Sequence, residues 1–506
     1  MDRPPFRFFQ RDEGANEARW ILFVAFFAIL ANIPFWVASR TVGLVCTGYV
    51  CLEYAAVGLL ALFIPRFVSA ILLFLAIGVD LLSSASQSYY LSPFECLSNL
   101  GSVHELSTSR LHTLETVVVL ALIATAIAAL FPSRKIRGKF RKRAAIAFVA
   151  LPFAFLLFDG ASVILKTGRV PNPFKPMTPM DAASIGYFKN PRLSRLPSMH
   201  LVHSQVMFSR LGGHVNAAEI DTSFIAGASA DAERAAGLYA TARPQALPNL
   251  VLIVVESWGL AKDTSLRSAL AAPYLRADLQ ARYEVSQGTV PFYGSTIAAE
   301  ARELCESKMG FHILDASAKE LQHCLPQRLA SLGYHDIAVH GMDGNMFRRF
   351  GWYSNIGFKE YFFRDQFEQQ GLPDCAGAFT GTCDAAIAKM IGLRLQNKST
   401  NPNFIYWVTL NSHLPVPLPP QLANPAQCSF ASPELNQASL CSWFQLVSNV
   451  QDSIVQLASA DFSRPTIFAI VGDHAPPFSD PVLRDEFSDT EVPYFLLVPR
   501  PPNKSR

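Results

Sequence analysis

Acidic side chains directly follow two strongly apolar stretches of this sequence. We expect a functional site where these side chains come together. Glu256 comes after Leu-Ile-Val-Val, while Asp473 comes after Ile-Phe-Ala-Ile-Val-Gly and precedes His474. In open α/β sheets, ligands bind at the carboxyl ends of the strands. Two carboxylates and one imidazole at that edge offer oxygen and nitrogen ligands that suit a divalent metal ion. A single such acid often only caps the next helix, whereas the pair with its histidine predicts a metal site.

Hydroxyl side chains near these acids are candidate nucleophiles. Ser257 lies in Glu-Ser-Trp-Gly, which is not the Gly-x-Ser-x-Gly turn of serine hydrolases. Ser295 and Thr296 are adjacent in Gly-Ser-Thr-Ile-Ala-Ala-Glu, and their residue types alone do not decide between them. Taken alone, His413 is typical of a structural histidine and Arg349 of a surface cation.

The elements that must position these residues alternate between strand-like and helix-like segments from Asn249 onward. This alternation predicts an α/β domain with a largely parallel central sheet. The expected organisation is a transmembrane anchor over 1–165, a connector over 166–248 that is Pro-rich at its start, and a catalytic domain over 249–506. The predicted strands are Leu250–Val255, Ile337–His340, Phe404–Thr409, Ile467–Val471 and Tyr494–Val498.

The anchor accounts for the apolar excess of the chain. Hydrophobic residues make up 50% of the sequence and charged residues 16%, with a mean hydropathy of +0.22. Soluble domains carry about 25% charged residues, and a spanning helix needs roughly 17–25 mostly apolar ones. Five segments, of which the third and fourth are short, therefore predict spanning helices: Trp20–Val37, Val42–Ile64, Phe67–Leu82, Thr116–Phe131 and Ala144–Ile164.

Basic residues orient these five spans. Loops rich in Lys and Arg stay on the cytoplasmic side of a membrane. Four arginines precede the first span, and seven basic residues lie between the fourth and fifth. Both cues place the N-terminus in the cytoplasm and everything after Ile164 outside it. The net charge of +3 is too small to indicate a nucleic-acid partner. The basic residues are Arg3, Arg7, Arg11 and Arg19, and then Arg134, Lys135, Arg137, Lys139, Arg141, Lys142 and Arg143.

Six of the nine cysteines follow the spans, and this even number predicts disulfide bonds. Fifteen pairings are open to six cysteines, and pairs that close short loops are preferred here: Cys305–Cys324, Cys375–Cys383 and Cys428–Cys441. Disulfides form in oxidising compartments. We therefore expect a multi-pass protein of a bacterial cytoplasmic (inner) membrane with its catalytic domain in the periplasm.

Four motifs together resemble a known family. Glu256 in its strand, Gly-Ser-Thr-Ile-Ala-Ala-Glu at 294–300, His413 in Thr-Leu-Asn-Ser-His-Leu-Pro and the Gly-Asp-His at 472–474 are similar to the lipoteichoic-acid synthase branch of the alkaline phosphatase superfamily. That branch is also described as sulfatase-like. The resemblance covers Asn249 to about Arg500, and the anchor with an outside domain matches as well. It implies an alkaline-phosphatase-like fold and the transfer of phosphoglycerol or phosphoethanolamine from phospholipids.

The resemblance also implies a metal centre. Glu256, Asp473 and His474 would bind one divalent ion, Mn²⁺ or Zn²⁺. Thr296 would be the fourth ligand and the nucleophile that becomes a phosphothreonine, with Glu300 in the family's position four residues later. Metal coordination lowers the pKa of a hydroxyl, which is otherwise a poor nucleophile at neutral pH.

Three further residues match substrate-binding positions of the family. His413 would bind the phosphate oxygens or protonate the leaving alcohol. Arg349 lies eight residues before Gly357, as the phosphate-binding arginine does, and His340 lies nine residues before Arg349 at a head-group position. The chain departs from the pattern at Met342, where an acid is usual, and at Phe347, where tryptophan is usual. These two departures weaken the case for a glycerol head group.

Three functions from different classes follow. The leading one is metal-dependent transfer of phosphoethanolamine or phosphoglycerol from a membrane phospholipid to an envelope glycan or lipid acceptor. The second is hydrolysis of a phosphodiester or sulfate ester at the same centre. Cys324–Arg328 fits the C-x-P-x-R pattern of true sulfatases, but the single Glu256 and the missing Thr-Gly argue against it, and Cys324 is expected in a disulfide. The third is an inactive partner in envelope polysaccharide assembly.

Overall fold

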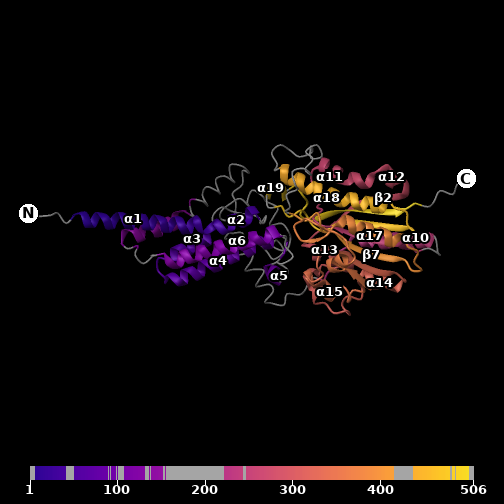
Figure 1. Cartoon of the computed structure of the whole chain (residues 1–506), viewed down its shortest axis with the longest axis horizontal. Helices are drawn as coiled ribbons and strands as arrows, with labels where there is room; N and C mark the ends of the chain where they lie inside the picture. The colour runs from indigo at the N-terminus through magenta and orange to yellow at the C-terminus, as the bar shows by residue number, and fades with distance from the viewer. Residues whose placement is uncertain are drawn as a thin grey trace, which may run out of the picture.

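The computed structural model describes most of the chain in six ranges, namely 6–41, 51–154, 222–242, 247–414, 437–478 and 481–500. Gaps within them fall at 89, 92, 99, 101–107, 132–135, 137, 152–153 and 485. Figure 1 shows the N-terminal helices at one end of an elongated molecule and the α/β domain at the other. Most of the predicted connector, 166–221, lies outside the described residues.

Three N-terminal helical segments are long and apolar enough to cross a membrane. They are Asn16–Ala38, Arg66–Ser86 and Leu111–Leu130, and they coincide with the first, third and fourth predicted spans. The second predicted span is helical only over Leu52–Leu60 among the described residues, and the fifth is described only as far as residue 154. Five spans therefore remain a prediction. The elements are α1 (Phe6–Ala28), η1 (Leu30–Asn32), α2 (Ile33–Thr41), α3 (Leu52–Leu60), α4 (Arg66–Ser88), α5 (Pro93–Ser98) and α6 (Thr108–Leu130).

An aromatic cluster holds this helical part together. The ring of Phe23 lies 5.0 Å from that of Phe27 and 5.7 Å from that of Phe148. Gly58 of α3 packs directly on this cluster, because a Cβ there would lie 2.6 Å from Phe148 and 2.7 Å from Phe27. Large apolar side chains such as Phe67 and Leu22 remain exposed. Exposed large apolar side chains on long apolar helices are typical of helices that face lipid.

A seven-stranded sheet in the order β2-β9-β8-β1-β7-β3-β4 forms the core of the second part. All neighbours from β8 to β4 pair in parallel, while β9 pairs antiparallel with β8 and β2. The prediction of a largely parallel sheet is confirmed. Strands β2 and β4 were not predicted, because their residues are mostly exposed or half-buried and form no apolar run. The strands are β1 (Asn249–Val255), β2 (Tyr283–Pro291), β3 (His335–His340), β4 (Glu360–Phe362), β7 (Asn403–Val408), β8 (Thr466–Gly472) and β9 (Glu491–Pro499), and a separate hairpin pairs β5 (Asp374–Cys375) with β6 (Gly381–Thr382).

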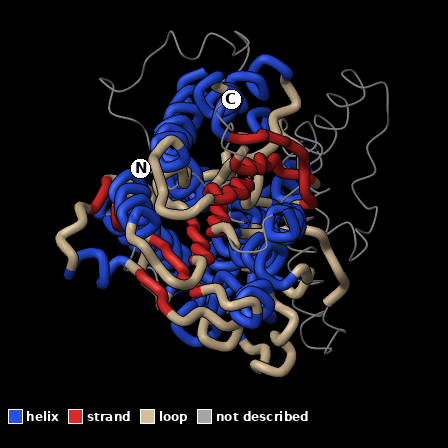
Figure 2. The backbone as a smooth tube through the Cα atoms, turned by 90° about the vertical axis from the view of Figure 1, so that its right-hand side faces the viewer, coloured by secondary structure: helices blue, strands red, loops and turns tan. Residues whose placement is uncertain are grey.

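Helices cover the sheet, whose strands run between them in Figure 2. Every residue of β1, β7 and β8 is buried, as a parallel sheet with two covered faces requires. Helices α10, α13 and α14 contact one another, and α18 contacts both α17 and η6. Helix α10 lies in the predicted connector, yet it packs against β1, β8 and β9. The elements are α10 (Ala228–Ala242), α11 (Thr264–Ala271), η6 (Ala272–Leu275), α12 (Ala277–Arg282), α13 (Thr296–Cys305), η7 (Gly310–Leu314), α14 (Leu325–Ser331), η8 (Met346–Arg348), α15 (Arg349–Trp352), α16 (Arg364–Gln369), α17 (Asp384–Gln396), α18 (Gln437–Ala458) and α19 (Pro481–Arg484).

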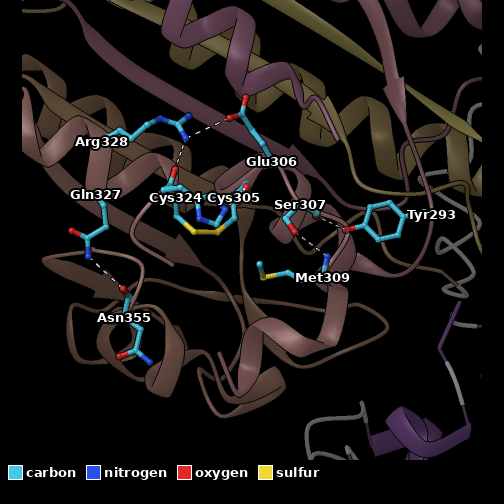
Figure 3. The surroundings of a disulfide bond; sticks show 10 residues. Tyr293, Cys305, Glu306, Ser307, Met309, Cys324, Gln327, Arg328 and Asn355 are labelled. Atoms are coloured by element: carbon cyan, nitrogen blue, oxygen red, sulfur yellow. Dashed lines mark hydrogen bonds and ion pairs between the residues drawn. A yellow bond between two sulfur atoms is a disulfide. The ribbon is translucent and has the colours of Figure 1, made fainter. Parts of the chain in front are cut away.

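Disulfide bonds close two of the predicted loops. Cys305 at the end of α13 is bonded to Cys324, and Figure 3 shows Arg328 contacting Glu306 beside this bond. Cys375 is bonded to Cys383 next to the β5–β6 hairpin. Cys441 is also disulfide-bonded, while Cys428 lies outside the described residues. The first two pairings are confirmed, and the first of them ties the C-terminal end of α13 to the segment that leads into α14.

A buried acid in β3 predicts that the domain loses stability as pH rises. Asp336 is fully buried and neither carboxylate oxygen has a hydrogen-bond partner among the described residues, so burial raises its pKa to about 7, opposed in part by the charge of Lys359. The folded form keeps the proton between about pH 4 and pH 7 while the unfolded form releases it. The free energy of unfolding therefore falls across this window, by at most roughly 4 kcal/mol.

We expect Asp336→Asn to remove this loss, because the amide does not ionise. Thermal unfolding at pH 5 and pH 8 should show a smaller difference for Asp336→Asn than for the wild type. The exposed Glu368→Gln serves as the matched control and should behave as the wild type does. An unchanged pH dependence in Asp336→Asn would mean that Asp336 is already ionised in the folded protein.

Candidate active site

The carboxyl ends of β1 and β8 bring the two predicted acids side by side. The strands pair in parallel with Val255 opposite Gly472, so Glu256 and Asp473 are the next residues on neighbouring strands. The chain turns sharply after β1, where Ser257 has a positive φ of 57°. Gly472 allows this turn, since a Cβ there would lie 1.9 Å from the carbonyl oxygen of Trp258. The register of two buried strands thus sets the distance between the acids.

Four candidate side chains meet at this point. The hydroxyl Oγ1 of Thr296, the first residue of α13, lies 3.2 Å from Glu256 Oε2 and 3.1 Å from Asp473 Oδ2. His474 Nε2 lies 3.4 Å from Glu256 Oε1 and 3.3 Å from Asp473 Oδ2. Ligand atoms of the two acids and the histidine all lie within 4.8 Å of one another. We call these four residues, all of them buried, the acid–histidine cluster.

Neighbouring groups turn the reactive atoms of the cluster inward. The backbone N–H groups of Ser257 and His474 donate to Asp473 Oδ1 at 2.7 and 2.6 Å, which leaves Oδ2 to face Thr296. The imidazole Nδ1 of His474 donates to the carbonyl oxygen of Ala475 at 2.9 Å. That bond leaves Nε2 with a lone pair toward the acids, which is how proteins orient a histidine that binds metal.

Burial makes the cluster electrostatically unfavourable on its own. Burial and then the charge of Asp473 raise the pKa of Glu256 to about 8, and burial raises the pKa of Asp473 to about 7. Burial also lowers the pKa of His474, which favours the neutral imidazole. Ionising both acids here is costly, since two like charges about 4 Å apart repel by about 4 kcal/mol at an effective dielectric constant of 20. A divalent cation would offset that repulsion, so these donors fit such an ion in number, charge and type.

The loop after β7 places His413 beside the cluster. Its Nε2 lies 3.8 Å from Glu256 Oε1, and its Nδ1 donates to the carbonyl oxygen of Leu414. Asp384 holds this loop, because its Oδ2 accepts the N–H groups of Leu410 and Asn411 at 2.9 and 2.7 Å. Asp384 was not predicted as a site residue from the sequence. An acid at the start of a helix is too common to single out without the loop that it binds.

An ion pair with Glu300 holds Arg349 at the site. Its Nε and Nη2 donate to Glu300 Oε1 at 2.9 and 2.7 Å, and the hydroxyl of Tyr353 lies 3.4 Å from the same oxygen. Glu300 lies one helical turn after Thr296 in α13, so this pair links the arginine to the threonine's helix. His340, the last residue of β3, donates through Nδ1 to the carbonyl oxygen of Val408 at 2.9 Å.

One cavity of about 630 Å³ joins these groups, a size within the roughly 300–1,000 Å³ of small-molecule pockets. Glu256, Thr296, His340, Arg349, His413 and His474 all line it. Its remaining wall is largely apolar and includes Met342, Phe347 and residues of α4 and α6 from the N-terminal part.

The C-x-P-x-R motif has no free cysteine to contribute. Cys324 is buried and disulfide-bonded to Cys305, at the opposite end of α13 from Thr296. A formylglycine nucleophile requires this side chain to be unpaired. The expectation that Cys324 belongs to a disulfide is therefore confirmed.

Comparison with known proteins covers the α/β half of the chain. The family model described as "Sulfatase" matches residues 248–505. A protein of Rhizobium meliloti (strain 1021), described as "Putative cyclic beta-1,2-glucan modification protein", is 28% identical over 150 residues, which span 29% of this chain and 22% of that relative. The match thus covers about a fifth of the relative's length.

The solved structures that match this chain are less similar to it in sequence. The lipoteichoic acid synthase LtaP from Listeria monocytogenes is 14% identical, with 52% of this chain and 67% of that chain covered and a TM-score of 0.37. The Streptococcus pyogenes phosphoglycerol transferase GacH is 18% identical, with 55% and 76% covered and a TM-score of 0.35. An alkaline phosphatase superfamily protein from Vibrio parahaemolyticus is 15% identical, with 50% and 60% covered and a TM-score of 0.33.

Proposed function

Because the chain belongs to the sulfatase family, within the transferases and hydrolases of the alkaline phosphatase superfamily, we propose that it transfers a phospho-alcohol head group between membrane molecules. The donor is a phospholipid that carries phosphoethanolamine or phosphoglycerol, and the acceptor is an envelope glycan or lipid. The protein sits in the bacterial cytoplasmic membrane with residues 249–506 in the periplasm.

The observation that carries this proposal is the position of Thr296. Its hydroxyl contacts both strand-end acids at 3.1–3.2 Å, on the first residue of a ten-residue helix. The N-terminus of a helix favours negative charge, and so favours a bound phosphate or an alkoxide at that position. A hydroxyl that only stabilised the fold would not need two buried acids and a histidine around it.

Thr296 serves as the nucleophile in the first half of the reaction. Its Oγ1 attacks the phosphorus of the donor, a P–O bond to the diacylglycerol oxygen breaks, and the head group stays on Thr296 as a phosphodiester. Thr296 reacts after its hydroxyl has released its proton to solvent, and His413, protonated at the Nε2 that faces Glu256, gives that proton to the leaving diacylglycerol oxygen. In the second half, Nε2 of His413 takes the proton of an acceptor hydroxyl, whose oxygen attacks the same phosphorus while the Thr296–phosphorus bond breaks.

The cluster is suited to hold one divalent ion, Mn²⁺ or Zn²⁺, through Glu256, Asp473, His474 and Thr296. Such an ion supplies positive charge that lowers the pKa of the Thr296 hydroxyl and offsets the charge of the phosphate oxygens. Arg349 binds the phosphate oxygens and His340 binds the alcohol part of the head group, and both line the same cavity. The Arg349–Glu300 pair fixes the guanidinium, so that its remaining N–H groups keep one orientation.

The description of one relative supports a glycan as the acceptor. The Rhizobium meliloti relative is named for the modification of a glucan, which is consistent with a glycan that carries free hydroxyl groups. Met342 and Phe347 make part of the wall next to His340 and Arg349 apolar. An apolar wall offers few partners for the hydroxyl groups of a glycerol head group, so both head groups must be tested.

We expect the purified full chain, given phospholipid labelled in its head group, to release unlabelled diacylglycerol and to label a periplasmic glucan. Phosphatidylethanolamine and phosphatidylglycerol are tested in parallel, each with and without the glucan. Label in the glucan identifies a transferase, whereas label only in a water-soluble head group identifies a hydrolase. If no diacylglycerol forms from either lipid, the phospholipid donor is wrong.

A further inference from the structure

The membrane helices and the acid–histidine cluster share the walls of one cavity. Gly78 and Leu82 of α4 and Val117 of α6 line the same space as Thr296 and His413. In sequence, α4 and Thr296 are separated by about 200 residues, so nothing local brings them together. The N-terminal helices therefore do more than attach the α/β domain to a membrane, since they complete its cavity.

Contacts at the end of α4 fix this arrangement. Arg484 of α19 donates through Nη2 to the carbonyl oxygen of Ser88 at 2.9 Å, and its guanidinium lies 5.1 Å from the ring centroid of Tyr90. The ring of Tyr90 lies 5.2 Å from the imidazole ring of His474. Tyr90 adopts a positive φ of 57°, a backbone conformation that a tyrosine rarely takes without tertiary support. Tyr90, two residues after the end of α4, thus packs directly on a member of the cluster.

The cavity opens toward the side of α4 where lipid would lie. Phe74 and Leu75 line it and are nevertheless 47% and 55% exposed. Both belong to Arg66–Ser86, one of the segments apolar enough to cross a membrane. Gly78 lies one turn further along, and a Cβ built on it meets no atom within 4 Å in the described part of the chain. We call the part of the cavity that runs from α4 to the Thr296 hydroxyl the channel. Its apolar wall suits a chain of methylene groups.

We propose that the part of the cavity between α4 and α6, at Gly78, Leu82 and Val117, binds an acyl chain of the donor lipid. This inference rests on the proposed function and adds the place where the lipid tail lies. The occupant is an acyl chain because the wall is apolar, open to the lipid side and continuous with the groups that would hold the phosphate. Each buried methylene raises the affinity for the donor about fourfold. Blocking part of the channel should therefore weaken the binding of a donor with long acyl chains and leave that of a donor without them unchanged.

The test fills the channel without touching the cluster. In Gly78→Phe the new ring occupies open space in the cavity, whereas Gly14→Phe makes the same change on α1 at a glycine that is equally unobstructed and lies outside it. The full chain in detergent is assayed with dioleoyl phosphatidylethanolamine, dioleoyl phosphatidylglycerol and the water-soluble diester bis(4-nitrophenyl) phosphate. We expect Gly78→Phe to raise KM for the dioleoyl donors about sixteenfold, the effect of two lost methylenes, and to leave KM for the soluble diester within about twofold. Gly14→Phe should change neither.

A labelling experiment on the wild type covers the case in which Gly78→Phe does not fold. A phosphatidylethanolamine with a photoreactive acyl chain should label peptides of α4 and α6, and excess dioleoyl lipid should reduce that label. Either of two results overturns the inference. One is a folded Gly78→Phe variant whose KM changes equally for both phospholipids and for the soluble diester. The other is a label confined to lipid-exposed positions outside the cavity. If the wild type cleaves the soluble diester but no phospholipid, the proposed donor is wrong instead.

Discussion

We expect Thr296→Ala to lower the transfer of the head group by at least about 10³-fold, because it removes the atom that forms the new bond to phosphorus. The hydroxyl carries one proton and lies 3.1–3.2 Å from two carboxylates, so it can donate to only one of them at a time. The substitution removes one hydroxyl and one methyl group at the first residue of α13. Alanine has the highest helix propensity, so the helix should still form. Thermal stability should therefore change little compared with activity.

The neighbouring serine provides the matched control. Ser295 precedes α13, lines the same cavity and makes no side-chain hydrogen bond that caps the helix. Ser295→Ala should keep most of the activity, and Thr296→Ser should keep part of it because the oxygen remains. Mass spectrometry of the wild type after brief exposure to donor lipid should find the mass of the head group on the peptide that contains Thr296.

Results in the opposite order would change the interpretation. If Ser295→Ala removes activity and Thr296→Ala does not, the nucleophile is the serine. If neither substitution affects the labelled product, a hydroxyl nucleophile in this segment is wrong. If Thr296→Ala also leaves the cellular phenotype unchanged, the alternative of an inactive partner in polysaccharide assembly gains support.

The site could be predicted from the sequence where it depends on strand ends. Glu256 and Asp473 each follow a continuous apolar stretch, and parallel strands place such residues at one edge. Thr296 could be chosen over Ser295 only through the spacing to Glu300, which belongs to the family resemblance. The structure adds a reason from contacts, since it is the Thr296 hydroxyl that lies against both acids.

Contacts between residues far apart in the chain could not be predicted from the sequence. Arg349 and Glu300 are 49 residues apart and carry no pattern that pairs them. Arg484 and Ser88 are 396 residues apart, and the bond between them goes to a backbone oxygen, which any residue could supply. Edge strand β2 was missed because only its two ends reach the core. These features depend on how whole elements pack, whereas hydrophobic periodicity reports on each element separately.

The largest expected effect after Thr296 is that of the metal ion. We expect a chelator to lower activity by about 10³-fold or more, and one equivalent of Mn²⁺ or Zn²⁺ to restore it. The physical reason is that the cation would let both buried acids be ionised, which burial and their mutual repulsion otherwise oppose. At a metal concentration 100 times Kd, binding stabilises the folded form by about 2.7 kcal/mol. For a domain of 150–250 residues this raises Tm by about 5–10 °C.

Glu256→Gln separates this metal effect from a general loss of stability, because it changes the two measurements in opposite directions. Without metal, burial keeps a proton on Glu256 that the unfolded form releases at pH 7, and the neutral amide removes this cost, so Tm should rise by a few degrees. With metal, a ligand charge is missing, so the stabilisation by Mn²⁺ or Zn²⁺ and the activity should both be lost. Asp336→Asn also removes a buried acid but lies away from the cluster, and its metal response should equal that of the wild type. If Glu256→Gln instead lowers Tm without metal and keeps the full response to the ion, the carboxylate stabilises the fold and the ion binds elsewhere.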